Sequence, residues 1–274
     1  MTLTRFASNA LCGLVFSLSF LSGTQAAVSG FDHSYKHYSS LLEKHVHWID
    51  NKKSTAVDYA SLKQDREDLK AILNRWSAVS SSAYEQFSRE QKMAFLINAY
   101  NGFTLELILT EYPDLNSIKE LGGFFSSPWK KEFFTLLGQK RTLDWIEHEQ
   151  LRPKFQDPRI HAAVNCASIG CPALLPEAYT ASKLDQQMEN SMQRFLSDQS
   201  RNRVENGQLK VSQIFDWFSE DFEQGFRGAD SVKEFLALYA EQLSDNPAIQ
   251  NQIKQGELGV SYLDYDWKLN DLSR

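Results

Sequence analysis

The sequence predicts an α+β fold: a helix-rich single domain with a central buried helix and a small β-sheet with hairpins. The first observation is the segment 89–111, which is apolar nearly all round and long enough for about six helical turns. The second is a pair of turn dipeptides, Gly138-Gln139 and Asn206-Gly207, each between short β-prone runs. Most other segments carry apolar residues at helical spacing, which makes the helices the larger part of the fold.

The composition fits a folded globular chain. Hydrophobic residues make up 42% of 274 residues, which is ample for a real core. The net charge of −6 and the absence of long basic clusters argue against a nucleic-acid partner. No segment after residue 26 is long and apolar enough to span a bilayer. We therefore expect no stable membrane insertion once the first segment is removed.

Residues 1–26 have the features of a secretory signal peptide. Arg5 supplies a positive charge, residues 10–21 form an apolar core, and Thr24-Gln25-Ala26 offers small residues for cleavage. We expect an exported protein, periplasmic or secreted, that begins after Ala26.

The segment 27–87 is predicted to be helical. Amphipathic spacing favours helices over residues 31–50 and 60–76, followed by a serine-rich linker at 77–83. His33 and His37 lie four residues apart on the first helix. Because no third ligand is marked, we interpret them as a solvated pair rather than a metal site.

The central helix opens the remaining segment, 88–274. Ser88 is placed to cap it, and Gln91 completes a capping box. Asn98 and Asn101 interrupt its apolar surface and share one face. Either the two amides satisfy backbone groups of a neighbouring loop, or they line a binding site.

Three features follow the central helix. The aromatic loop 122–129 is either a substrate-facing wall or a loop packed onto the core. A hairpin is expected around Gly138-Gln139. Asp144 is then placed to cap a helix, with Glu147 at the capping-box position, which gives Glu147 a structural role.

The last third of the chain is predicted to be mostly helical. It also contains a type I′ hairpin at Asn206-Gly207 and a final strand over 260–265. Capping residues and apolar spacing mark its helices, which begin at Thr180, Ser212, Ser231 and Asn246-Pro247.

Residues 157–172, D-P-R-I-H-A-A-V-N-C-A-S-I-G-C-P, combine more reactive side chains than any other segment. Residues 159–164 favour a short strand, in which His161 and Asn165 face the same side. Beyond the signal peptide the chain has only two cysteines, Cys166 and Cys171.

The first interpretation of this segment is thiol-dependent hydrolysis or acyl transfer. Cys166 would be the nucleophile and His161 its base, with Asn165 or Glu147 orienting the imidazole. Strand alternation opposes it, because His161 and Cys166 then point to opposite sides unless the chain turns at Asn165.

The second interpretation is a disulfide between Cys166 and Cys171, which export would favour. The protein would then be a non-catalytic, disulfide-stapled binding protein of the cell envelope. Its groove, lined by Asn98, Asn101, His161 and the aromatic loop, would take a small molecule or a peptide. The third interpretation is zinc bound by both cysteines and His161, but the spacing lacks a second pair of ligands. We expect no cofactor and no metal.

The chain resembles domain-of-unknown-function family 547 (DUF547). The resemblance rests on A-F-L-I-N-A-Y-N-G at 94–102, T-L-D-W-I-E-H at 142–148, the segment 157–172, and I-F-D-W-F-S-E-D-F at 214–222. It implies no transferable activity. It does mark matches to the family motifs, and from these we expect Arg159 to join the binding residues. The matches are Asn98, Asn101, Glu147, Arg159, His161, Asn165, Cys166, Cys171 and Pro172.

Overall fold

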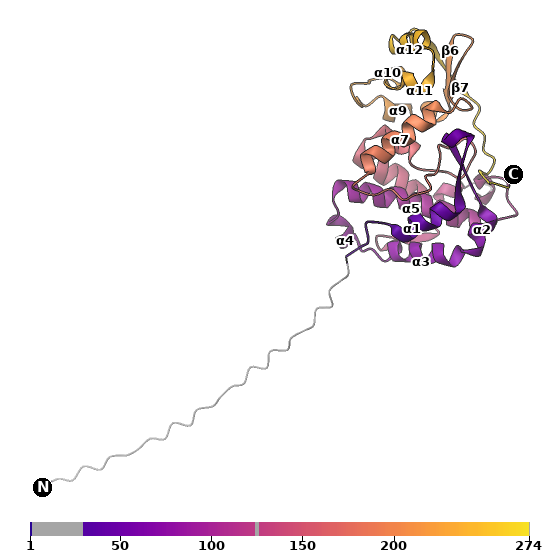
Figure 1. Cartoon of the computed structure of the whole chain (residues 1–274). Helices are drawn as coiled ribbons and strands as arrows, with labels where there is room; N and C mark the ends of the chain where they lie inside the picture. Colours follow the sequence, from indigo (N-terminus) through magenta and orange to yellow (C-terminus); the bar gives the residue numbers. More distant parts are fainter. Residues whose placement is uncertain (2–29, 124–125, 274) are drawn as a thin grey trace. The chain divides into compact units, whose positions relative to one another are not determined.

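The computed structural model describes residue 1, residues 30–123 and residues 126–273. The predicted signal peptide therefore lies, apart from Met1, outside the described residues. The chain divides into two compact units, Met1–Phe31 and Asp32–Arg274. The second unit confirms the predicted class, since many helices accompany three small sheets (Figure 1). Within the described ranges, no helix has the length and apolarity needed to cross a membrane.

The first predicted helix is shorter than expected. Helix α1 covers Lys36–His45, and β1 (Val46–Ile49) then pairs antiparallel with β2 (Ser54–Val57). The reversal between the strands is η1, Asp50–Lys52, in which all three residues have positive φ. The helical prediction for 31–50 was wrong at its end, because pairing with β2 outweighed the helical spacing.

The second predicted helix is two helices. Helix α2 covers Tyr59–Gln64 and α3 covers Arg66–Ser77, with Asp65 between them. Asp65 accepts a hydrogen bond from His45 of α1 at 2.8 Å, which ties the break to the neighbouring helix. Helix α4, Ser81–Glu85, begins within the predicted linker 77–83, because Ser80 caps the first turn of this helix.

The central helix is confirmed as α5, Arg89–Leu109. Ser88 and Gln91 make the predicted capping box, and nearly every side chain from Met93 to Leu109 is buried. Helix α3 packs closely against α5 at Gly102, which has no side chain to separate them. Helix α5 is therefore the core element on which the neighbouring segments are placed.

The hairpin after α5 forms one residue earlier than predicted. Strands β3 (Phe134–Leu136) and β4 (Gln139–Arg141) are joined by Leu137 and Gly138, both with positive φ. The ring of Phe134 stacks on Phe103 of α5 at 3.9 Å. Short 3₁₀ turns η2 (Ile118–Leu121) and η3 (Pro128–Lys130) precede the hairpin.

Three short helices follow the hairpin, and the last of them lies within the cysteine segment, residues 157–172. They are η4, a π-helix (Trp145–Leu151), α6 (Arg152–Phe155) and η5, a 3₁₀ helix (Pro158–Ala162). The strand predicted over 159–164 was wrong. Asp157 accepts a hydrogen bond from the Arg159 N–H at 3.0 Å, and Pro158 fixes the first turn.

The C-terminal part has its own hydrophobic core. The hairpin at Asn206-Gly207 is confirmed, and the final strand pairs parallel with the second strand of that hairpin. Figure 1 shows these strands beside the last helices. The elements are α7 (Leu184–Ser197), β5 (Arg203–Glu205), β6 (Gln208–Ser212), α8 (Ile214–Trp217), α9 (Ser219–Phe222), α10 (Val232–Ala237), α11 (Ala240–Leu243), α12 (Pro247–Lys254) and β7 (Gly259–Leu263).

Candidate functional site

A cavity of about 220 Å³ lies beside the cysteine segment. Its polar side chains come from η4, from Asp144 directly before η4, and from η5, and its aromatic side chains come from distant parts of the chain. The polar members are Asp144, Glu147, His148 and His161; the aromatic members are Tyr100, Trp129, Trp217, Phe218, Tyr265 and Trp267. Cys166 and Cys171 also line it.

The aromatic wall is built from rings that pack on one another. Trp217 and Trp267 stack with centroids 5.6 Å apart, and Tyr265 lies 4.9 Å from Trp217 and 4.5 Å from Trp267. Trp129 of η3 meets Trp267 edge-on at 5.8 Å. Trp217 remains 45% exposed, so part of this wall is open to a ligand.

The π-helix η4 carries Glu147 into the cavity. The predicted capping role was wrong: the Thr142 hydroxyl, not Asp144, accepts the hydrogen bond from the Trp145 N–H, at 2.9 Å. Glu147 is instead buried to 7% exposure against Tyr100 of α5. Burial raises the pKa of the Tyr100 phenol, and the Glu147 charge raises it further. Tyr100 therefore stays protonated and can donate to Glu147.

His161 is held in one orientation by three contacts. Its Nε2 lies 2.7 Å from Asp221 Oδ2, its Nδ1 lies 3.9 Å from Glu147 Oε1, and its ring stacks on Phe218 at 4.2 Å. Asp221 accepts from Nε2–H, and Nδ1 faces Glu147. The histidine therefore lines the cavity with its second ring nitrogen beside a carboxylate.

Asp221 of α9 was not among the predicted site residues. It also pairs with Nε of Arg152, and Nη1 of the same guanidinium lies 2.8 Å from His148 Nδ1. Burial raises the pKa of Asp221, but hydrogen bonds from His161 and Arg152 outweigh it and lower the pKa to about 2. The only sequence signal for Asp221 was its place in the family-like segment 214–222.

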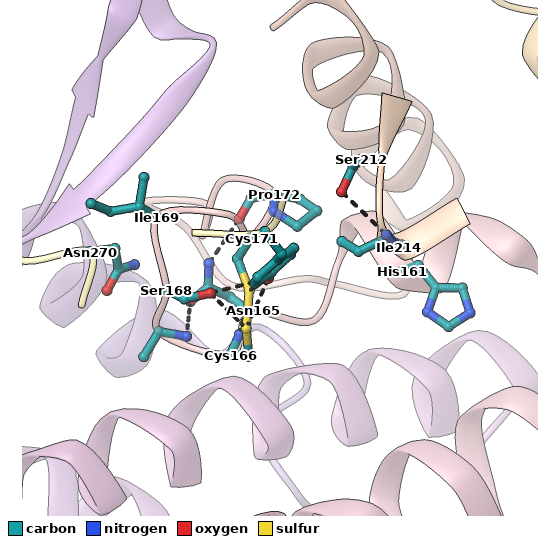
Figure 2. The surroundings of a disulfide bond; sticks show 12 residues. His161, Asn165, Cys166, Ser168, Ile169, Cys171, Pro172, Ser212, Ile214 and Asn270 are labelled. Atoms are coloured by element: carbon teal, nitrogen blue, oxygen red, sulfur yellow. Dashed lines mark hydrogen bonds between the residues drawn. A yellow bond between two sulfur atoms is a disulfide. The ribbon is translucent and has the colours of Figure 1, made fainter. Parts of the chain in front are cut away.

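Cys166 and Cys171 form the predicted disulfide, with Cα atoms 6.3 Å apart (Figure 2). Their loop packs closely on Tyr265: a Cβ added at Gly170 would lie 2.8 Å from that ring. In Figure 2 the His161 imidazole lies apart from the two sulfurs.

The oxidised pair changes the chemistry expected of the segment. Neither sulfur is a resting thiolate, so neither the nucleophile nor the zinc site is available in this state. The described polar contacts of Cys166 Sγ are with the hydroxyl oxygens of Ser168 at 3.1 Å and Tyr265 at 3.2 Å, not with His161. Asp221 makes the closest polar contact to the imidazole, Glu147 lies 3.9 Å from the other ring nitrogen, and the Asn165 side chain bonds to the loop backbone instead.

The two amides of α5 hold loops in place. Asn98 donates to the Tyr179 carbonyl at 2.8 Å and accepts from the Tyr179 N–H at 2.9 Å. Asn101 donates to the Ala163 carbonyl at 2.9 Å and accepts from the Asn165 N–H at 2.8 Å. Both ends of each amide are used, which matches the first of the two interpretations of these residues.

Asn165 and Arg159 also make internal contacts. The Asn165 amide donates to the Pro172 carbonyl and accepts from the Ala167 N–H, each at 2.8 Å, which shapes the disulfide loop. Arg159 is buried among carboxylates; it pairs with Asp157, Asp185 and Glu189. The described lining of the cavity includes none of Asn98, Asn101, Asn165 and Arg159.

Residues 84–196 match a family model described as "Protein of unknown function, DUF547". The match confirms the resemblance drawn from the motifs. No curated protein matches the chain, and no solved structure matches it. The matched segment contains Glu147, His161 and both cysteines, whereas Asp221 and four aromatic members of the cavity follow it.

Proposed function

We propose that this chain, whose residues 84–196 match the DUF547 family model, is a disulfide-stapled binding protein for a small organic molecule. The observation that supports this proposal is the cavity lined by aromatic rings together with Glu147 and His161. Small-molecule sites combine apolar walls with a few placed polar groups in this way. A volume of about 220 Å³ suits a ligand of one or two rings rather than a peptide.

The charge of the cavity favours one kind of ligand. Asp144 and Glu147 are acidic, and the Trp217 ring, which is 45% exposed, can attract a cation through its face. The favoured ligand therefore has a planar or apolar part and a positively charged or hydrogen-bond-donating group. A periplasmic or secreted location accords with this proposal, because disulfides persist in oxidising compartments.

Three one-ring probes test this proposal: benzylamine, benzyl alcohol and benzoate. We expect saturable quenching of tryptophan fluorescence, tightest for benzylamine and weakest for benzoate. Trp217→Ala should weaken binding about tenfold, the effect of losing about 1.4 kcal/mol of ring contact. Trp48→Ala, in β1, is the matched control and should leave binding unchanged. Equal binding by the Trp217 variant, or no saturable binding by any probe, would contradict the proposal.

The second candidate is hydrolysis or acyl transfer with Cys166 as nucleophile and His161 as base. The favouring observation is the orientation of His161 by Asp221 in the same cavity wall as Cys166. The thiol is free only after reduction of the disulfide. Reduced protein should therefore hydrolyse p-nitrophenyl acetate, and Cys171→Ser should do so without reductant. Activity that persists in His161→Gln and Cys166→Ser would exclude it.

A further inference from the structure

The two sulfurs of the disulfide have different surroundings. Both cysteines line the cavity, but Cys166 is half-buried whereas Cys171 is only 4% exposed. A molecule in the cavity therefore meets the Cys166 sulfur more readily than its partner. Attack on Cys166 Sγ would release Cys171 Sγ as the leaving group.

Hydrogen-bond donors surround the leaving sulfur. The Cys166 N–H donates to Cys171 Sγ at 2.9 Å, and the Tyr265 hydroxyl lies 3.1 Å from Cys171 Sγ and 3.2 Å from Cys166 Sγ, so its one proton can be donated to Cys171 when that sulfur leaves as a thiolate. The Ser168 hydroxyl donates to the Tyr265 oxygen at 3.1 Å, which leaves the Tyr265 proton for a sulfur. Burial raises the pKa of Tyr265, so it remains a donor at neutral pH. Such donors stabilise a thiolate more than they stabilise a neutral disulfide.

The loop between the cysteines is also fixed at two of its four residues. The Ile169 N–H donates to the Lys268 carbonyl and the Gly170 N–H donates to the Asp266 carbonyl, each at 2.8 Å. These bonds do not involve the sulfurs, so they persist when the disulfide opens. The two reduced cysteines would stay near each other and ready to re-form the bond.

We propose that the Cys166–Cys171 disulfide is redox-active and exchanges with a small thiol that enters the cavity. The proposal rests on the proposed function only in that the thiol uses the same cavity. It adds a chemical reaction to a site whose disulfide would otherwise serve as a staple alone.

The exchange proceeds in two steps. The incoming thiolate attacks Cys166 Sγ, the bond between the protein sulfurs breaks, and Cys171 leaves as a thiolate held by Tyr265 and the Cys166 N–H. A second thiolate then attacks the sulfur of the small molecule in the mixed disulfide, and Cys166 leaves. Two small thiols are oxidised to their disulfide, and the protein receives two electrons and binds two protons.

Cysteamine and its disulfide cystamine, mixed in graded ratios, are the test reagents, because this thiol is small and positively charged. Native protein should equilibrate with them, as measured by alkylation of free thiols and mass spectrometry. Cys171→Ser should accumulate a cysteamine adduct on Cys166. Cys166→Ser should form its adduct far more slowly, because Cys171 is buried. Full oxidation of the native protein in excess cysteamine, with reduction only after unfolding, would overturn the proposal.

Tyr265→Phe separates an activated disulfide from a merely accessible one. The ring contacts with Trp217 and Trp267 remain, and only the hydroxyl is lost. We expect reduction to slow about tenfold, which corresponds to one hydrogen bond to a charged group. Tyr262→Phe, on the exposed face of β7, is the control and should not change the rate. An unchanged rate in Tyr265→Phe would overturn the stated mechanism.

Absence of probe binding alongside normal exchange would overturn only the proposed function.

Discussion

Single carboxylates set the charge of the cavity and hold its histidine. Asp221 keeps its charge although it is largely buried, because His161 and Arg152 both donate to it. Glu147 faces the other ring nitrogen of His161 and the Tyr100 phenol. The imidazole therefore lies between two acidic groups, which is why its orientation is so closely defined.

Asp221→Asn should change how stability depends on pH. The pKa of Asp221 is about 2 when folded against a usual 3.8, so the ionised carboxylate stabilises the fold above pH 4. This contribution is lost as pH falls from 3.8 towards 2. We expect the variant to be less stable by about 2 kcal/mol at pH 7, with the difference shrinking towards pH 2. Urea unfolding at several pH values measures it.

Asp216→Asn is the matched control, since Asp216 is an exposed carboxylate on the neighbouring helix α8. Its unfolding curve should follow that of the unmodified protein throughout. A difference for Asp221→Asn that stays constant from pH 7 to pH 2 would show that the Asp221 charge does not stabilise the fold.

Among the elements, those with local start and stop signals were predictable from sequence. Ser88 and Gln91 begin α5, and Asn206-Gly207 forms the β5–β6 turn, because each signal acts within a few residues. The 3₁₀ helix at Pro158–Ala162 was not predictable from its alternating pattern, which the Asp157 cap overrides. The π-helix that turns Glu147 inward has no comparable local signature.

Gly102→Ala should destabilise the contact between α3 and α5. Alanine favours a helix by about 1 kcal/mol over glycine. Here, however, its Cβ would lie 2.9 Å from both Leu73 and Trp76 of α3. We expect the clash to prevail, with a net loss of about 1–2 kcal/mol in the free energy of unfolding. Gly259→Ala, where a Cβ meets nothing within 4 Å, is the control. A gain in stability for Gly102→Ala would show that α3 shifts to make room for the added methyl group.

At the scale of the molecule, the site joins residues that are far apart in the chain. Asp221 lies 60 residues after His161, and Tyr265 lies 99 residues after Cys166. The disulfide was predictable because its cysteines are neighbours in sequence. The orienting carboxylate and most of the aromatic wall were not, because only the tertiary fold brings α8, α9 and the C-terminal segment to η5.

The segment after β7 is anchored on the N-terminal part of the same unit. Tyr59 of α2 donates to the buried Asn270 side chain at 2.8 Å, and the Val57 N–H donates to the Asn270 carbonyl at 2.8 Å. The Leu269 N–H donates to the Asn116 carbonyl at 2.7 Å. These contacts hold the segment that carries Tyr265 and Trp267.

Tyr59→Phe should loosen this anchorage without removing a ring from the core. Loss of the bond to Asn270 should lower stability by about 1 kcal/mol. Hydrogen exchange at the Leu269 and Gly170 amides should accelerate more than exchange at amides inside α5. Uniform acceleration across the protein would mean that the segment opens only when the whole unit unfolds.

The separation between Tyr265 and the cysteines also gives an order of events during biosynthesis. A ribosome adds Cys166 and Cys171 almost together, and Tyr265 about a hundred residues later. At about 5–20 residues per second, the nascent chain exposes both thiols for several seconds before the phenol that covers them exists. An oxidant can therefore meet two uncovered thiols in the nascent chain, whereas in the described part of the completed fold Cys171 is only 4% exposed and both cysteines line the cavity.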